Sequence, residues 1–321
     1  MNKSMQSGFA MVIVIWVLSL LTIMAGSFAL TMRRETTIVS AVKDNAMTLA
    51  TAETGVTIAQ QRLLESDENK RWQADGSVYQ LQYEDAEIRV RLFLEQGKID
   101  INKADEVLLT SMMSSTSLEL DKQQALVNAI MDWRDNDDLV RIDGAEKQQY
   151  EEEGLSYQPA NKPFQLIYEL QLVLGMDANI YKELQELVTV YSTQAQVDLE
   201  VASKEVLTAV GDMEPEELEE YLQQRTDNNQ AQLSTATEPD AQNGQKNSRS
   251  LEQGVYTIIS EARLFGEVSS GIKVIMKKTS NGNEGNPFQV LDWQQLYQES
   301  SLFGEDVGQL IVTEQTEQDE S

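Results

Sequence analysis

The stretch from Phe9 to Met32 is the feature that most constrains this chain, because it contains no charged residue. At about 1.5 Å of rise per residue, a helix of this length crosses the roughly 30 Å hydrocarbon core of a bilayer. The sequence after it is rich in charged and polar residues, as in a soluble domain. We therefore predict a transmembrane helix over residues 9–32 that continues as a helix over residues 33–66.

Residues 1–8 form a short polar leader that contains Lys3 and ends in Gly8 before Phe9. An ordinary secretory signal has a shorter apolar core followed by an A-x-A-like cleavage site, and the nearest candidate, Ala25-Gly26-Ser27, is weak. The leader instead resembles the class III signal of type IV pilins and pseudopilins, which a prepilin peptidase cuts after the glycine. The resemblance implies a mature chain that starts at Phe9. The alternative is a plain N-terminal anchor that is not cut.

Ile13 would be the fifth residue of that mature chain, flanked by Val12 and Val14. Most members of the pilin and pseudopilin families have a glutamate there, which pairs with the terminal amine of a neighbouring subunit. A carboxylate in an environment that resembles lipid is tolerated only with such a partner. The resemblance therefore implies that a subunit with Ile13 has no subunit above it and lies at the tip of a filament.

The composition excludes several classes of function. The chain has 321 residues with no cysteine and no histidine, which removes thiol catalysis, the usual general base and the usual ligands of transition metals. Asp and Glu outnumber Lys and Arg by 53 to 25, a formal net charge of −28. Such a chain is not expected to bind nucleic acid or to adsorb on anionic lipid. Its length allows two core-forming units beyond the anchor.

Period-two alternation of apolar residues predicts hairpins over residues 78–95 and 255–278 and a further strand over residues 288–293. In residues 33–66 apolar side chains recur at helical spacing among many small residues, which allow another backbone to approach. We expect the lower half of this helix to lie on its own sheet, whereas the upper half could equally pack on a neighbouring subunit. The expected fold class is α+β, with an antiparallel sheet.

Three further segments with helical periodicity lie between the two hairpins, over residues 118–133, 164–175 and 178–191. They predict a large inserted all-helical domain. Residues 225–250 carry almost no large apolar side chain and are expected to form a flexible loop. The tail after residue 296 is acidic, although its residues 310–312 could add a short strand.

A weak internal repeat relates two segments at a constant offset of 98 positions. Its identical pairs are Asp100 and Asp198, Ala104 and Ala202, Leu109 and Leu207, and Thr110 and Thr208. Each copy is interpreted as a short strand, a polar turn and a helix, and the two copies would be equivalent entry and exit points of the helical block. Chance similarity is the alternative.

The densest group of candidate metal ligands lies between Asp132 and Gly154. Ligands that are all oxygen, on a flexible loop, suit Ca²⁺ better than Zn²⁺ or Cu²⁺. An EF-hand register that starts at Asp135 fails, because Leu139 and Val140 occupy the positions where a ligand and a glycine are needed. A different calcium loop and a merely solvated acidic loop both remain open.

A second resemblance covers the same region and extends from the leader to about Trp293. Its residues are Asp132-Trp133-Arg134-Asp135, Gly144-Ala145-Glu146, Tyr150, Tyr157, Ala160-Asn161-Lys162-Pro163-Phe164, Glu169-Leu170 and Leu174-Gly175-Met176. This pattern resembles the large minor pseudopilin of type II secretion systems, the general secretion pathway protein K family. The resemblance implies a pilin-like α/β domain interrupted by a large helical domain. It also implies calcium near the acidic loop, with Asp132, Asp135, Asp137, Asp143 and Glu146 as the ligands.

The expected domain limits follow from these patterns. They are 1–8 for the leader, 9–32 for the transmembrane helix, 33–66 for its continuation, 67–105 and 196–295 for the two parts of the pilin-like domain, 106–195 for the helical insertion and 296–321 for the acidic tail. The flexible loop 225–250 lies in the second part.

The function expected from the resemblance is that of a minor pseudopilin without enzymatic activity. It would lie at the tip of the pseudopilus with two other minor pseudopilins, of the I and J types, and would prime filament assembly for protein export. The major pseudopilin and the prepilin peptidase are further expected partners. The chain would cross the inner membrane once, with its bulk in the periplasm. The flanking charges Lys3, Arg33 and Arg34 do not decide this orientation.

Two alternatives belong to other classes of function. One is a membrane-anchored calcium-binding protein that never enters a filament. The other is a hydrolase that uses paired carboxylates, from the acidic cluster or from Asp100 and Asp198, with split pKa values. The sequence has no G-x-S-x-G motif and no phosphate-binding loop, so the hydrolase is disfavoured.

Overall fold

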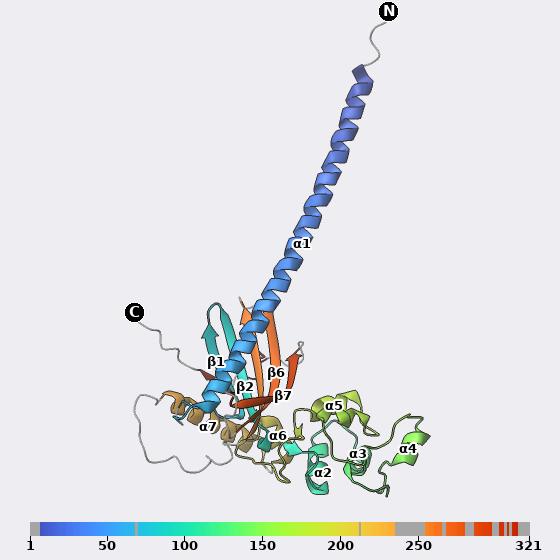
Figure 1. Ribbon diagram of the computed structural model, residues 1–321, viewed down its shortest axis with the longest axis vertical. Coiled ribbons are helices and arrows are strands. Elements are labelled where there is room, and N and C mark those ends of the chain that lie inside the picture. The colour runs from blue at the N-terminus through green and yellow to red at the C-terminus, as the bar shows by residue number, and fades with distance from the viewer. Residues whose placement is uncertain are drawn as a thin grey trace, which may run out of the picture.

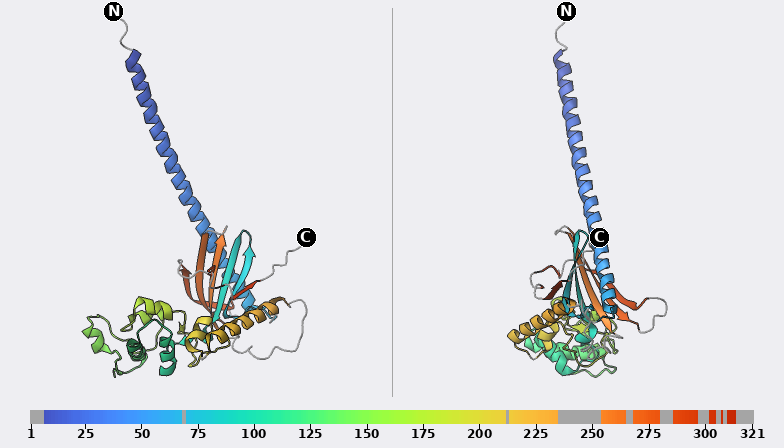
Figure 2. Two further views of the ribbon diagram at one scale, coloured as in Figure 1. Left: turned by 180° about the vertical axis from the view of Figure 1, so that it is seen from behind. Right: turned by 90° about the vertical axis from the view of Figure 1, so that its left-hand side faces the viewer.

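A long helix, a sheet at its lower end and a block of short helices beside the sheet make up the molecule (Figures 1 and 2). The computed structural model describes residues 7–67, 70–211, 213–234, 254–264, 268–279, 286–296, 302–304, 307 and 310–313. The leader residues 1–6, most of the expected loop 225–250 and much of the acidic tail lie outside the described residues. The fold is α+β, as predicted.

Helix α1 runs without a break from Ser7 to Leu64, which confirms the predicted continuation of the apolar helix. In the part of the chain that the structure describes, it is the one helix long and apolar enough to cross a membrane. Its upper part projects away from the rest of the molecule (Figure 1). Ala52, Val56 and Ala59 on its lower part are buried against the sheet. The lower half therefore packs on its own sheet, as predicted.

The main sheet has the strand order β7-β6-β5-β2-β1-β8. Its strands are β1 (Asp75–Tyr83), β2 (Ala86–Leu94), β5 (Val255–Leu264), β6 (Val268–Lys278), β7 (Phe288–Leu296) and β8 (Ile311–Thr313). Both predicted hairpins and the predicted strand at 288–293 are confirmed. The sheet is antiparallel except at one edge, where β8 runs parallel to β1. The expected strand in the tail is confirmed there.

At Gly55, α1 lies very close to the sheet. A Cβ atom at this position would lie 2.2 Å from Ser260 Oγ and 2.8 Å from Ile88 Cγ2. Closer to the membrane end of α1, Thr48 makes a polar contact with the sheet, because its Oγ1 atom lies 3.1 Å from Ser270 Oγ on β6. The small residues that the sequence places on this helix therefore serve helix–sheet packing within the chain.

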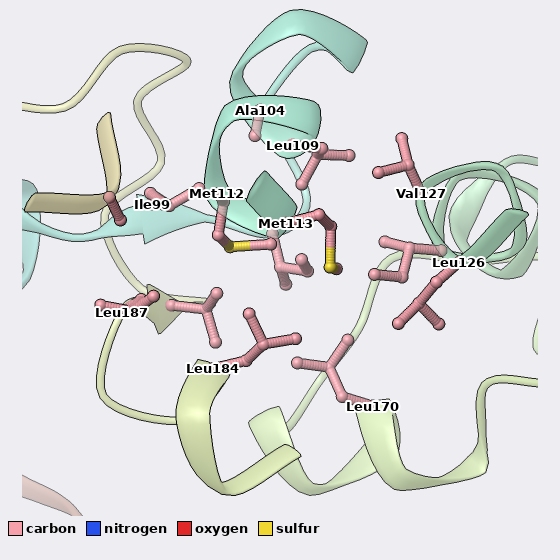
Figure 3. Packing of buried hydrophobic residues seen from close by; sticks show 14 of the residues in the cluster. Ile99, Ala104, Leu109, Met112, Met113, Leu126, Val127, Leu170, Leu184 and Leu187 are labelled. Carbon is pink, nitrogen blue, oxygen red and sulfur yellow. The ribbon is translucent and has the colours of Figure 1, made fainter. Parts of the chain in front are cut away.

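The helical block has a hydrophobic core of its own (Figure 3). Figure 3 shows Met112, Met113 and Leu109 facing Leu126 and Leu184 across this core. Its elements are α2 (Glu106–Ser114), α3 (Leu120–Arg134), α4 (Lys147–Glu152), η2 (Ile167–Leu172), α5 (Ala178–Leu184), α6 (Lys204–Val210), α7 (Pro215–Ser234) and the paired strands β3 (Ile99–Asp100) and β4 (Val188–Thr189). The core extends to α7, past the expected limit at residue 195.

Three predictions about local structure need correction. The segment 164–175 forms only the short 3-10 helix η2, because Pro163 precedes it and Gly175 leaves it with φ +88°. The helix expected over 178–191 ends at Leu184, since the chain must turn into β4. Residues 225–234 belong to α7 rather than to a loop. Arg225 fixes that helix by donating hydrogen bonds to the carbonyl oxygens of Ala202 and Asp75.

The two copies of the internal repeat share their polar turn and the cap of the following helix. The strand predicted at residues 197–199 of the second copy does not form. The Oδ1 atoms of Asp100 and Asp198 accept hydrogen bonds from the backbone N–H two residues on, at 2.9 and 3.1 Å. Asp105 and Ser203, again 98 positions apart, cap α2 and α6. The two helices touch, and Ser111 Oγ on α2 donates to a carbonyl oxygen on α6.

Glu95 joins the sheet to the helical block. It lies in the short 3-10 helix η1 (Glu95–Gly97), and its buried carboxylate accepts hydrogen bonds from Lys98 Nζ and from Thr257 Oγ1 on β5, both at 2.7 Å. Thr189 on β4 donates a third hydrogen bond. Burial by itself raises the pKa of Glu95, but the Lys98 ammonium and the three hydrogen bonds outweigh burial and hold this pKa below its ordinary range.

Candidate cation-binding loop and membrane anchor

Asp132, in the last turn of α3, organises the acidic loop that connects α3 to α4. Its side chain is fully buried, and its Oδ2 atom accepts hydrogen bonds from the backbone N–H groups of Arg141 at 3.2 Å and Ala145 at 2.9 Å. Gly144 is needed between them, because a Cβ there would lie 2.1 Å from Asp132 Oδ2. The loop backbone therefore wraps around one buried carboxylate. Burial raises the pKa of Asp132, and this effect exceeds the lowering by the two hydrogen bonds.

Glu146 and Asp135 add further carboxylate oxygen atoms to this region, and three of these oxygens accept no hydrogen bond from the described residues. Both carboxylate oxygens of Glu146 and the Oδ1 atom of Asp135 are buried and have no hydrogen-bond partner among the described residues. Burial, followed by the charges of Asp132 and Asp135, raises the pKa of Glu146 to about 7. Buried carboxylates without partners are costly, and either a proton or a bound cation would relieve that cost.

Arg141 supplies one positive charge to these carboxylates. Its Nε atom lies 3.3 Å from Asp132 Oδ1, and its Nη2 atom lies 3.7 Å from Asp135 Oδ2. The Oδ1 atom of Asp132 still receives no hydrogen bond of acceptable geometry from the residues that the structure describes. The guanidinium therefore neutralises the pair in part, and it leaves the Glu146 carboxylate without an ion pair among the described residues.

The structure divides the five predicted ligands into two groups. Asp132, Asp135 and Glu146 turn toward the interior, whereas Asp137 and Asp143 are exposed. Asp137 Oδ1 accepts a hydrogen bond from the Leu139 N–H at 2.9 Å, and Asp143 adopts a left-handed conformation with φ +56°. These two residues shape the turn of the loop in this structure.

Asn161 is a candidate ligand that was not predicted from the sequence. Its Nδ2 atom donates to Asp138 Oδ1 at 2.8 Å and to the carbonyl oxygen of Asp137 at 3.2 Å, while its own Oδ1 atom is buried without a partner among the described residues. An amide oxygen is a good ligand for a hard cation. The signal available in the sequence was an asparagine before Lys162-Pro163 in a segment that already resembled a known family.

The donors fit a calcium ion in chemical type, because they are carboxylate and amide oxygens with free lone pairs. The distances between these oxygen atoms are larger than those in an assembled metal site. Within the described ranges no group of three or more acidic side chains is close enough to hold a metal ion. Binding would therefore require the loop to contract around the ion.

The residues predicted for processing and for the tip position lie at the upper end of α1. Gly8 and Phe9 fall in its first turns, since the helix begins at Ser7. The side chains of Phe9 and Ile13 are exposed, as expected of a helix whose surroundings are lipid or partner helices.

Comparison with known proteins finds a match in the central region of the chain. Residues 89–193 match the family model for type II secretion system (T2SS) protein K. This segment of the chain is therefore similar to protein K, and the rest of the chain lies outside the match. The acidic loop and Asn161 both lie within the matched segment, whereas α1 lies before it.

Two curated proteins named type II secretion system protein K also match parts of the chain. The type II secretion system protein K of Klebsiella pneumoniae is 32% identical over 77 residues, 24% of each chain. That of Pseudomonas aeruginosa is 28% identical over 149 residues, 43% of this chain and 44% of that protein. The chain thus matches less than half the length of these relatives.

A solved structure is similar over a larger part of the chain. The match is to a chain in the crystal structure of the GspK-GspI-GspJ complex from the enterotoxigenic Escherichia coli Type 2 Secretion System. The superposition covers 83% of the present chain and 99% of the chain in that crystal structure. The two are 15% identical, with a TM-score of 0.46.

Proposed function

We propose that this chain is a minor pseudopilin at the tip of a type II secretion pseudopilus and that it primes the filament that exports folded proteins. The observation that carries the proposal is the protein K domain at residues 89–193, attached to the single unbroken helix α1. The upper part of α1 is apolar and uncovered, and its lower part is packed on the sheet. One rigid element therefore connects a membrane anchor to the folded domain.

This geometry suits a subunit that moves from the membrane into a filament. The apolar helix holds the precursor in the inner membrane, with the folded bulk in the periplasm. After cleavage between Gly8 and Phe9 by a prepilin peptidase, the same helix packs beside the helices of two other minor pseudopilins, of the I and J types, and then of the major pseudopilin. The chain acts mechanically in this proposal, without enzymatic catalysis.

The alternative of a carboxylate hydrolase loses its second candidate pair in the structure. Asp100 is buried, and its two oxygens accept hydrogen bonds from the backbone N–H groups of Asn102 and Thr193. Asp198 accepts from the N–H of Glu200. Both carboxylates form turns at the ends of the helical block, and this role accounts for their position.

The decisive experiment is the N-terminal sequence of the protein isolated from membranes, with and without the prepilin peptidase. We expect a mature chain that starts at Phe9 only when the peptidase is present, and a Gly8→Ala variant that keeps its leader and does not support secretion. A Gly26→Ala variant, altered far from the cleavage position, should be processed normally. A start at Met1 in both strains would leave a simple anchored protein and end the proposal.

We further propose that the acidic loop binds Ca²⁺ through the inward-facing oxygens of Asp132, Asp135 and Glu146, with Asp137 and Asp143 completing the site. The support is the buried carboxylate oxygens that lack partners among the described residues. A divalent cation would compensate their charges more completely than Arg141 does, and it would tie α3 to α4.

Calcium should then stabilise the full-length protein in detergent. A ligand that binds only the folded state at 100 times its Kd adds about 2.7 kcal/mol, so we expect the Tm to rise with calcium and to fall with a chelator. Glu146→Gln should abolish this response and raise the Tm of the metal-free protein, since it removes a carboxylate whose ionised form is disfavoured.

The control is Glu151→Gln, because Glu151 is exposed on α4 and its ion pair with Lys147 lies at the surface. It should respond to calcium as the wild type does. Identical melting curves of the wild type with calcium and with chelator would remove the calcium proposal, while the proposed role in secretion would stand.

A further inference from the structure

Three large aliphatic side chains, Leu139, Val140 and Ile142, lie in solvent within four positions of the acidic loop. Their exposed fractions are 77%, 48% and 86%. We refer to these three residues as the aliphatic tip. Isolated exposed aliphatic residues such as Val107 and Leu120 are ordinary on a protein surface, whereas three within four positions of one loop make a candidate interaction site.

The backbone beneath the aliphatic tip is held in place by buried polar groups. Asn128 Nδ2 donates to the carbonyl oxygen of Ile142 at 2.8 Å, and the N–H of Arg141 donates to buried Asp132. Turning the three side chains inward would break these hydrogen bonds and leave buried polar atoms without partners, which is unfavourable. The exposure of the aliphatic tip is therefore built into the loop.

The charges around the aliphatic tip are negative. Asp137, Asp138 and Asp143 are exposed on either side of it. Arg141, which lies between two of the aliphatic residues in the sequence, directs its guanidinium toward the carboxylates of Asp132 and Asp135. An acidic rim repels an anionic lipid surface, and it also repels a second copy of this chain with its net charge of −28.

The loop also lies far from the membrane anchor. It leads into α4, at the end of the helical block farthest from the sheet and α1 (Figures 1 and 2). In a filament whose subunits contact one another through α1, this end of the block would face outward. This step rests on the proposed function.

We infer that the aliphatic tip is a docking element for another protein, one with an apolar pocket bordered by lysine or arginine side chains. The aliphatic residues would enter the pocket, and its positively charged rim would lie against the acidic loop. Apolar burial would provide the affinity, and the charges would select the partner and speed the encounter.

A secretion assay tests the inference in a strain that lacks its own copy of this gene. Full-length wild type, Leu139→Gln/Ile142→Gln and the control Val107→Gln/Leu120→Gln are compared at equal amounts in the membrane. The control residues are exposed by 77% and 81% in the same block. We expect export to fall by about tenfold or more for the Leu139→Gln/Ile142→Gln variant. The control variant should reduce export by less than about twofold.

The outcomes separate this inference from the proposed function. If the wild type does not restore export, the proposed function fails. If the wild type and the tip variant export within about twofold of each other, the docking inference is overturned and the proposed function stands. A loss of the same size in the control variant also overturns it, because the effect would then not be specific to the tip.

Photo-cross-linking in secreting cells identifies what the aliphatic tip touches. A benzoylphenylalanine replaces Ile142 in one full-length chain and Leu120 in another. An adduct with one different protein, formed from position 142 only and mapped next to lysine or arginine, supports the inference. An adduct with lipid, an adduct with a second copy of the chain or no adduct at all overturns it.

Discussion

Gly55 shows how a single residue sets the distance between the anchor helix and the sheet. Glycine in the middle of a helix is unfavourable by about 1 kcal/mol relative to alanine. The chain tolerates this cost because Ser260 Oγ and Ile88 Cγ2 occupy the space where a Cβ would be. Local helix propensity is therefore overruled by packing at this position.

We predict that Gly55→Ala destabilises the full-length protein in detergent by up to about 2 kcal/mol. Overpacking costs about 1–3 kcal/mol, and it outweighs the gain of about 1 kcal/mol in helix propensity. Gly26→Ala on the same helix is the matched control, because a Cβ there meets nothing within 4 Å. Urea unfolding measures both variants, and a Gly55→Ala protein as stable as the Gly26→Ala protein would contradict this account.

The candidate ligands illustrate what residue type can and cannot predict. The family resemblance implied five acidic ligands, and the structure turns Asp132, Asp135 and Glu146 inward while Asp137 and Asp143 remain exposed. Sequence spacing alone could not make that division, because burial depends on where α3 and α4 pack. Asn161 was missed for the same reason, since only tertiary packing brings it to the loop.

Among the elements, strands and the long helix were easier to predict than the short helices. The alternation in β1 and β2 and in β5 and β6 survives in the structure because one face of the sheet is buried under α1. Residues 164–175 have a helical period, but Pro163 and the left-handed Gly175 limit them to the 3-10 helix η2. Such short segments take their conformation from what they pack on.

We predict that Glu95→Gln weakens the junction between the sheet and the helical block. Removing one partner of a buried ion pair costs about 3–5 kcal/mol, because Lys98 would keep its buried charge. The matched control is Glu219→Gln, an exposed residue on α7. Urea unfolding at pH 7 is the measurement, and equal stability of the two variants would count against an ionised Glu95.

The pH dependence of this difference follows from the direction of the pKa shift. The folded protein holds the pKa of Glu95 below the ordinary value of 4.5, so the native state favours the ionised form. Its contribution is complete above that value and is lost as the pH falls through the lower folded pKa. The stability gap between wild type and Glu95→Gln should therefore narrow below pH 4.5. A constant gap across that range would contradict the shift.

At the scale of the whole molecule, α1 unites an uncovered apolar segment and a packed segment in one rigid rod. A force applied at the membrane end would therefore be transmitted directly to the sheet and, through Glu95 and α7, to the helical block. The proposed filament subunit would need such a continuous connection. Ile13 lies in the uncovered part of this rod, where the proposed tip position can be tested.

We predict that Ile13→Glu alters the number or length of pseudopili and reduces export. A carboxylate in the bilayer core costs about 2.5–3.5 kcal/mol without a partner, and a tip subunit has no neighbour above it to provide one. Ile13→Leu keeps the apolar character and should behave as the wild type. Electron microscopy of pseudopili and an export assay provide the readout. Filaments and export like those of the wild type in the Ile13→Glu variant would argue against the tip position.

The sequence by itself determined the elements whose signals are local. The uncharged run from Phe9 to Met32, the strand alternation and the concentration of aspartates can each be read along the chain, because hydrophobic period and composition are local properties. Only the tertiary structure decided which carboxylates are buried without partners among the described residues, which helix face meets the sheet at Gly55 and which aliphatic residues are left in solvent at the tip of the loop. Those outcomes depend on contacts between residues far apart in the sequence, and no local pattern contains them.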